Sequence, residues 1–184
     1  LHSFPTRRSS DLMHFDKDFI KQRQILINGQ KPQVIILTCS DSRVVPAYIF
    51  DEDLGTSFVI RSAGNVIDSI IVGSIEYAGI YLGAKLLLIL GHESCGGIKA
   101  AFNGNCESVH LSKTLSLITP AVRFAKSLKY DDTQTIELAT IENIKNQMKK
   151  VYSESPILKK MNESKQFFIV GAYYSLSTGK VEFL

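Results

Sequence analysis

The chain has no tryptophan, only three cysteines and no long apolar run. Its longest apolar stretch, residues 85–91, is far shorter than the roughly 20 residues that a membrane-spanning helix needs. We therefore expect no membrane partner. Three cysteines in 184 residues are too few for a disulfide framework, which favours reduced thiols that are available to bind a metal. Reduced thiols are typical of a cytoplasmic protein.

The chain also lacks a large excess of positive or negative charge. The formal net charge is +3, and the lysines are scattered among acidic and amide residues without forming a basic stripe, so we expect no nucleic-acid partner. No G-x-G-x-x-G motif follows a predicted strand, which argues against a dinucleotide-binding domain. A hydrophobic content of 45% in 184 residues fits one domain with a single core, and the expected ligand is a small molecule.

The first twelve residues, LHSFPTRRSSDL, have no apolar period and no helix start signal. They match one reading frame of a common sequencing-adapter oligonucleotide, so we interpret residues 1–12 as a non-native segment. The alternative is a native tail without regular structure. Residues 13–184 are predicted to form a single domain with an N-terminal helical arm. Apolar residues at helical spacing place this arm at Phe15–Leu26, before a helix stop at Asn28 and Gly29.

Three continuous apolar runs predict buried parallel strands, at Val34–Thr38, Phe58–Arg61 and Leu86–Leu90. Between the last two runs, residues 69–82 carry apolar side chains at helical spacing. Strand, helix and strand therefore alternate, as in βαβ units with right-handed crossovers.

The second half of the chain favours helices, followed by a hairpin. We predict helices over residues 98–102, 120–128 and 136–151, with a loop over residues 103–112. Two final strands, Phe167–Tyr174 and Val181–Leu184, are joined by a turn rich in small and polar residues. The predicted fold class is α/β, with a central, mostly parallel β-sheet flanked by helices and an antiparallel edge strand.

Metal-binding side chains follow two of the predicted strands. Cys39 follows the first strand, and His92 and Cys95 follow the third, so all three are expected at the carboxyl edge of the sheet. Two thiolates and an imidazole suit Zn²⁺, and three protein ligands leave open the fourth position that a catalytic zinc needs. The alternative is that these are ordinary buried residues. Cys106 has no companion in its polar loop and is not expected to bind metal.

Asp41 and Arg43 lie in the turn directly after Cys39. An arginine can grip a carboxylate with two hydrogen bonds and hold it ionised. Beside a metal-bound water, such a carboxylate would accept a hydrogen bond and direct the attacking lone pair. We therefore predict that Asp41 and Arg43 are catalytic, the alternative being an ordinary salt bridge within a turn.

The sequence contains four motifs: Cys39-Ser40-Asp41-Ser42-Arg43, Arg61-Ser62-Ala63-Gly64-Asn65, Ser74-Ile75-Glu76-Tyr77-Ala78 and Gly91-His92-Glu93-Ser94-Cys95-Gly96-Gly97. In order and spacing, these motifs resemble those of β-carbonic anhydrases. The resemblance is dense over residues 30–101 and weaker over residues 142–147. It implies zinc-dependent, reversible hydration of carbon dioxide to bicarbonate and a proton, with Zn²⁺ on Cys39, His92 and Cys95.

The resemblance also implies roles for further residues. Asp41 would pair with Arg43 in the active state, or bind the metal as a fourth ligand in a closed state. Gln30, Phe58 and Tyr77 would line the substrate pocket from the adjoining subunit of a homodimer or a dimer of dimers. We add Gly96 and Gly97 to the substrate-binding set, because adjacent glycines permit a close backbone approach.

Some similar bacterial enzymes hold regulatory bicarbonate in a second pocket that includes a tryptophan. The matching positions here are Ile36, Arg61 and Tyr174. Because Ile36 offers no indole N–H, we expect weak bicarbonate binding there and Asp41 paired with Arg43.

Two other functions remain open at this point. Hydrolysis of carbonyl sulfide or carbon disulfide would use identical ligands, and the width of the pocket would decide between these substrates. A non-catalytic zinc or thiol redox-sensing module would use Cys39 and Cys95. The paired Asp41 and Arg43 argue against such a module, which has no need of them.

Overall fold

The computed structural model describes residues 19–104 and 106–184, and the chain divides after Gln30 into two units. The described part of the first unit holds helix α1 (Phe19–Ile25) and the 3-10 helix η2 (Leu26–Asn28). Residues 19–28 are thus helical, and the helical stretch ends before Gly29 as expected. Residues 15–18 and the predicted non-native segment 1–12 lie outside the described residues.

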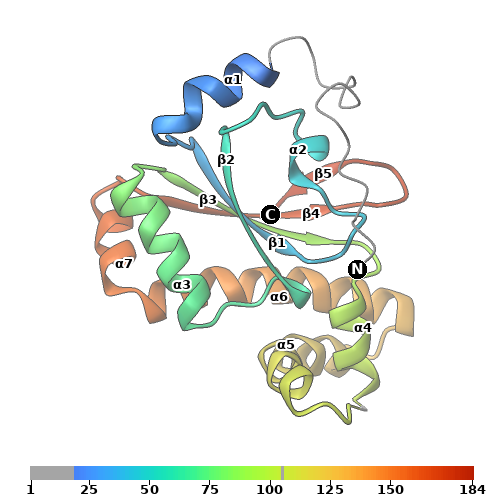
Figure 1. The fold of residues 1–184 in the computed structure, drawn as a ribbon. Helices are drawn as coiled ribbons and strands as arrows, with labels where there is room; N and C mark the ends of the chain where they lie inside the picture. The colour runs from blue at the N-terminus through green and yellow to red at the C-terminus, as the bar shows by residue number, and fades with distance from the viewer. Residues whose placement is uncertain (1–18, 105) are drawn as a thin grey trace. The chain divides into compact units, whose positions relative to one another are not determined.

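The second unit is built on a five-stranded sheet of order β2-β1-β3-β4-β5 (Figure 1). The strands are β1 (Val34–Cys39), β2 (Ser57–Ser62), β3 (Leu86–His92), β4 (Phe168–Tyr174) and β5 (Val181–Phe183). The first four are parallel, and β5 pairs antiparallel with β4. The predicted fold class is confirmed, including the antiparallel edge strand.

The helices of this unit follow the predicted order with several differences. They are α2 (Pro46–Ile49), the 3-10 helix η3 (Ala63–Asn65), α3 (Ser69–Glu76), the π-helix η4 (Tyr77–Tyr81), α4 (Gly96–Asn103), α5 (Val109–Ser127), α6 (Asp132–Glu154) and α7 (Pro156–Glu163). Helix α5 begins at Val109, inside the segment predicted as a loop. The Ser108 side chain caps it by accepting from Leu111 N at 3.3 Å. The sequence predicts a helix that starts at Pro120, but Pro120 lies inside α5.

Strand β1 is buried on both faces, which explains its continuous apolar run. Ile35 and Leu37 belong to a core cluster that includes Ile144 of α6, while Ile36 belongs to a cluster with Val44. Figure 1 shows α3, α6 and α7 on the same side of the sheet. No helix within residues 19–104 or 106–184 combines the length and apolar character that a membrane span requires.

The chain order places a switch point between β1 and β3. From β1 the chain leads to the edge strand β2, and β3 then lies on the other side of β1 and pairs with β4. Ligands of open α/β sheets bind beyond the carboxyl ends of the strands at such a point. The two strands are tied near this end, where Thr38 Oγ1 donates to Leu90 O at 3.1 Å.

Candidate metal centre

Three metal-binding side chains converge at the switch point. Cys39 is the last residue of β1, His92 is the last residue of β3, and Cys95 precedes the first turn of α4. All three are buried, and one ligand atom from each lies within 4.8 Å of the others. The two Sγ atoms are 3.8 Å apart. The strands and the short β3–α4 loop thus bring together the residues that the sequence nominated.

The His92 ring is oriented for binding through Nε2. Its Nδ1 lies 2.8 Å from Glu93 O, and because a carbonyl can only accept, Nδ1 carries the proton and Nε2 has the free lone pair. Nε2 is buried without a hydrogen-bond partner, 3.9 Å from Asp41 Oδ2. A buried ring nitrogen left without a partner calls for an explanation, and a bound metal ion supplies one.

The two thiols shift each other's pKa in opposite directions. Their hydrogen bond lowers the pKa of Cys39, and the same hydrogen bond together with burial raises the pKa of Cys95. Gly64 N also donates to Cys39 Sγ at 3.3 Å, which stabilises the thiolate. Two sulfurs and an imidazole nitrogen are the donor set of many zinc sites, so these residues fit that metal.

Two glycines let the backbone reach the Cys39 sulfur. Gly64 has φ +72°, and a Cβ at Gly97 would come within 3.1 Å of Gly64 Cα and N. The backbones of η3 and α4 therefore touch, in a way that a side chain at Gly97 would prevent. A Cβ at Gly96 would meet nothing within 4 Å, so the close approach that the sequence suggested for both glycines is made by Gly97.

A buried polar chain links α6 to the same loop. Asn143 Nδ2 donates to Gly64 O at 2.9 Å, Gln147 Nε2 donates to Asn143 Oδ1 at 3.1 Å, and Ile67 N donates to Gln147 Oε1 at 2.9 Å. Both side chains are almost fully buried. The sequence predicts no role for them, because their partners are brought near only by folding.

Asp41 and Arg43 form the two-pronged contact that the sequence suggested. Arg43 Nε donates to Asp41 Oδ1 at 2.9 Å and Nη2 donates to Oδ2 at 2.8 Å, while Arg43 N also donates to Oδ1 at 3.0 Å. These bonds hold the pKa of Asp41 well below its usual range. The carboxylate is therefore ionised and faces His92, while the Arg43 side chain is 55% exposed.

Arg61 holds the loop that carries Asp41. Its Nε donates to Cys39 O at 3.1 Å, and its Nη2 donates to Asp41 O at 2.6 Å and to Val44 O at 2.8 Å. The sequence suggested this arginine only as an anion partner and did not predict its hydrogen bonds to three backbone carbonyls. Tyr174 lies in the cluster that contains Ile36, and weak bicarbonate binding at these positions stays a prediction.

The residues nominated for substrate binding are less closely grouped. Phe58 of β2 and Tyr77 of η4 have ring centroids 6.1 Å apart, and Tyr81 stacks on Tyr77 at 6.0 Å. Gln30 is exposed and belongs to the first unit. Substrate contacts by Gln30, Phe58, Tyr77, Gly96 and Gly97 stay a prediction.

Comparison with known proteins agrees with this geometry. Residues 34–181 match the family described as carbonic anhydrase, a span that contains the three metal-site residues and both members of the charged pair. The solved β-carbonic anhydrase CcaA superposes with a TM-score of 0.80 at 27% identity, over 95% of this chain and 88% of that one. The chain belongs to the β-carbonic anhydrase family.

Other carbonic anhydrases resemble it to a similar degree. CafA of Aspergillus fumigatus superposes with a TM-score of 0.83 at 26% identity, over 94% of this chain and 85% of that one. A carbonic anhydrase of Mycolicibacterium smegmatis is 31% identical and covers 89% of this chain and 80% of its own length. Carbonic anhydrase 2 of Mycobacterium tuberculosis is 32% identical over 88% and 78%. The family match also extends beyond residues 30–101, where the sequence motifs are dense.

Proposed function

We propose that this β-carbonic anhydrase hydrates carbon dioxide reversibly to bicarbonate and a proton, using a zinc ion held by Cys39, His92 and Cys95. The observation that carries the proposal is the unpartnered, buried His92 Nε2 beside two buried sulfurs and an ionised carboxylate. The donor set favours zinc over harder metals, and three ligands leave one position for water. Zinc bound there would supply Lewis acidity that brings the pKa of water from about 15.7 toward neutrality.

Asp41 orients the attacking oxygen in this proposal. Its Oδ2 lies on the His92 side of the carboxylate and accepts a hydrogen bond from the reacting water, which leaves the oxygen lone pair facing carbon dioxide. Arg43 keeps Asp41 ionised and keeps its oxygens in place. The proton released in the reaction leaves to solvent or buffer.

Asp41 is also proposed as a metal ligand in a closed state. Its carboxylate would first have to give up both hydrogen bonds from Arg43. Because these two hydrogen bonds join a planar guanidinium group to a carboxylate of opposite charge, we expect the arrangement with Arg43 to prevail at neutral pH.

We further propose that the substrate pocket is completed in a homodimer or a dimer of dimers, to which Gln30, Phe58 and Tyr77 contribute. Exposed apolar side chains support this assembly. Tyr77 and Tyr81 are 47% and 78% exposed, and on the first unit Ile25 and Ile27 are 70% and 75% exposed. We place the protein in the cytoplasm, where both thiols stay reduced.

The substrate test compares three linear molecules on zinc-loaded protein. We expect rapid hydration of carbon dioxide in a stopped-flow pH-indicator assay and much slower hydrolysis of carbonyl sulfide and carbon disulfide. Faster turnover of either sulfur compound would contradict the proposed substrate. Stoichiometric zinc without turnover of any of the three would favour the redox-sensing module instead.

A further inference from the structure

We propose that Glu93 is a positioning residue of the metal centre, whose side chain fixes the peptide carbonyl that orients the His92 ring. This inference rests on the proposed function, because it gives Glu93 its role through a metal ligand. Glu93 touches neither substrate nor metal in this proposal. It acts through the single hydrogen bond between His92 Nδ1 and Glu93 O, which is 2.8 Å long.

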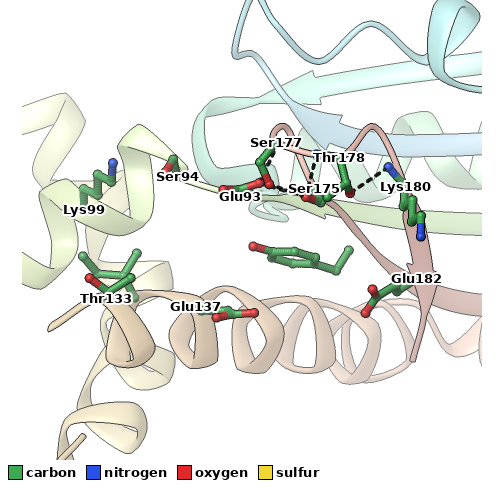
Figure 2. A pocket seen from close by; sticks show the side chains of 12 residues that line it. Glu93, Ser94, Lys99, Thr133, Glu137, Ser175, Ser177, Thr178, Lys180 and Glu182 are labelled. Carbon is green, nitrogen blue, oxygen red and sulfur yellow. Dashed lines mark hydrogen bonds between the residues drawn. The ribbon is translucent and has the colours of Figure 1, made fainter. Parts of the chain in front are cut away.

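Glu93 is held at both its backbone and its side chain. Its N–H donates to Tyr174 O at 2.8 Å, which extends the pairing of β3 with β4 by one residue. Its Oε2 accepts from Ser175 Oγ and from Ser177 N, each at 2.9 Å. Figure 2 shows this carboxylate turned toward the serines of the turn between β4 and β5.

The turn that receives the carboxylate is itself well fixed. Ser175 N donates to Lys180 O, and Gly179 N donates to Ser175 O, each at 2.9 Å. Thr178 N donates to Ser175 Oγ at 3.3 Å, so the same hydroxyl serves both the turn and Glu93. The turn therefore offers Glu93 a hydroxyl and an N–H at fixed positions.

The effect of this contact passes directly to the metal site. Glu93 lies between His92 and Cys95, and the following residue, Ser94, has φ +55°, an uncommon conformation for a side-chain-bearing residue. Because only Glu93 and Ser94 separate His92 from Cys95, a rotation of the Glu93 peptide has to be taken up within two residues. Such a rotation would remove the acceptor of His92 Nδ1–H and turn the buried Nε2 away from the two sulfurs.

Glu93 can be changed without opening the core. Its side chain lines a cavity of about 530 Å³, together with Lys99, Tyr173 and Glu182. Figure 2 shows Glu93 and Glu182 on different parts of the cavity wall. Replacing either glutamate removes atoms from a cavity wall and not from packed interior, so both variants are expected to fold. Glu182 therefore supplies a matched control.

Three substitutions separate position from charge. Glu93→Gln keeps an oxygen that can accept from Ser175 and Ser177 but removes the charge. Glu93→Asp keeps the charge but is one methylene shorter, so its carboxylate falls short of the turn. Glu93→Ala removes both the charge and the acceptor. Each variant is compared with wild type and with Glu182→Ala.

The first readout is the rate at which zinc-loaded protein releases zinc to a chelator, with thermal unfolding as a check on the fold. Loss of an outer partner of a ligating histidine typically costs 10-fold to 100-fold in metal affinity. We expect Glu93→Ala and Glu93→Asp to release zinc about ten-fold faster than wild type. Glu93→Gln and Glu182→Ala should stay near the wild-type rate.

The second readout is the ¹⁵N spectrum of the His92 ring in metal-free protein, which reports the tautomer without any zinc. Wild type and Glu93→Gln should keep the proton on Nδ1, and Glu93→Ala should show a mixture of tautomers. A wild-type release rate and an unchanged tautomer in Glu93→Ala would overturn the proposal. A wild-type release rate in Glu93→Asp together with faster zinc release in Glu93→Gln would also overturn the proposal. The charge of the side chain would then matter, and the position of its oxygen would not. Wild type that binds no zinc would contradict the proposed function, while the tautomer would still test Glu93.

Discussion

Arg43 lowers the pKa of Asp41. The side-chain hydrogen bonds from Arg43 are the largest cause of the lowered pKa, with a smaller contribution from the Arg43 backbone N–H. A lowered pKa in the folded state means that the stabilisation is present above the unfolded value of about 3.9 and is lost only in stronger acid. Asp41 therefore does not titrate near neutral pH, and any rise of the hydration rate toward alkaline pH has another origin.

We expect Asp41→Asn to keep zinc and lose most of the hydration rate, because an amide is a poorer acceptor and can offer a donor instead. Arg43→Ala should also lose rate, since it frees Asp41 to move onto the metal. Elemental analysis and stopped-flow rates on the same samples check both variants. A wild-type rate in Asp41→Asn would show that the charged pair only shapes the turn.

Cys39→Ala and Cys95→Ala are each expected to abolish stoichiometric zinc binding and activity, because a site with two remaining ligands holds metal too weakly. Cys106→Ala is the matched control. The Cys106 Sγ donates to Ser108 O at 3.4 Å and is not part of the ligand set, so this variant should keep both zinc and activity. Elemental analysis after dialysis measures the zinc content. Full occupancy in either of the first two variants would remove Cys39 or Cys95 from the ligand set.

Individual residues differ in how well the sequence predicts them. Cys39, His92 and Cys95 could be nominated because each follows a strand whose apolar run is visible in the sequence. The roles of Arg61, Glu93 and Asn143 could not be, because their partners are mostly backbone carbonyls or turn residues brought near only by folding. Asn143, for example, contacts Gly64 across 79 positions of the sequence. Neither the amino-acid composition nor the periodicity of hydrophobic residues indicates such a pairing.

At the scale of elements, α6 supports the metal centre through its buried amides. Asn143→Ala would leave Gly64 O without its donor and Gln147 Nε2 without its acceptor. Leaving a buried polar group unpaired costs about 1–3 kcal/mol, so we expect a loss of that size in the free energy of unfolding. Asn146→Ala on the same helix is the control, since Asn146 is only half-buried and its side chain makes no hydrogen bond within residues 19–104 and 106–184. Denaturant unfolding measures both, and equal losses would argue against the network.

The sequence predicts the strand ends to within two residues, whereas several helix ends lie further from their predicted positions. A parallel strand is visible as a continuous apolar run, and β1, β2 and β3 each have one. The predicted burial is correct for β1 and β3 but wrong for β2, an edge strand in which Ile60 alone is buried. Helix α5 was placed too late because its first half carries few buried residues, and its exposed Val109 and Leu111 obscure the period. Helix α7, an eight-residue helix with Leu158 as its buried side chain, is not among the predicted helices.

At the scale of the whole molecule, we expect a dimer or a larger even-numbered assembly. Closed symmetric dimers dominate soluble oligomers, and exposed aromatic side chains such as the stacked Tyr77 and Tyr81 are typical of a contact surface. Light scattering at assay concentration should give at least twice the mass of one chain, and Tyr81→Glu should shift it toward the monomer. A fully active monomer would contradict the proposal that the pocket is completed by a second subunit.

The most direct measurement is a titration of metal-free protein with zinc, in which the rate of carbon dioxide hydration is followed at each addition. The Cys39, His92 and Cys95 site predicts a rate that rises linearly and stops rising at one zinc per chain, with Cys39→Ala flat throughout. A rate that does not depend on added zinc, or an equal rise in Cys39→Ala, would contradict a catalytic zinc at this site.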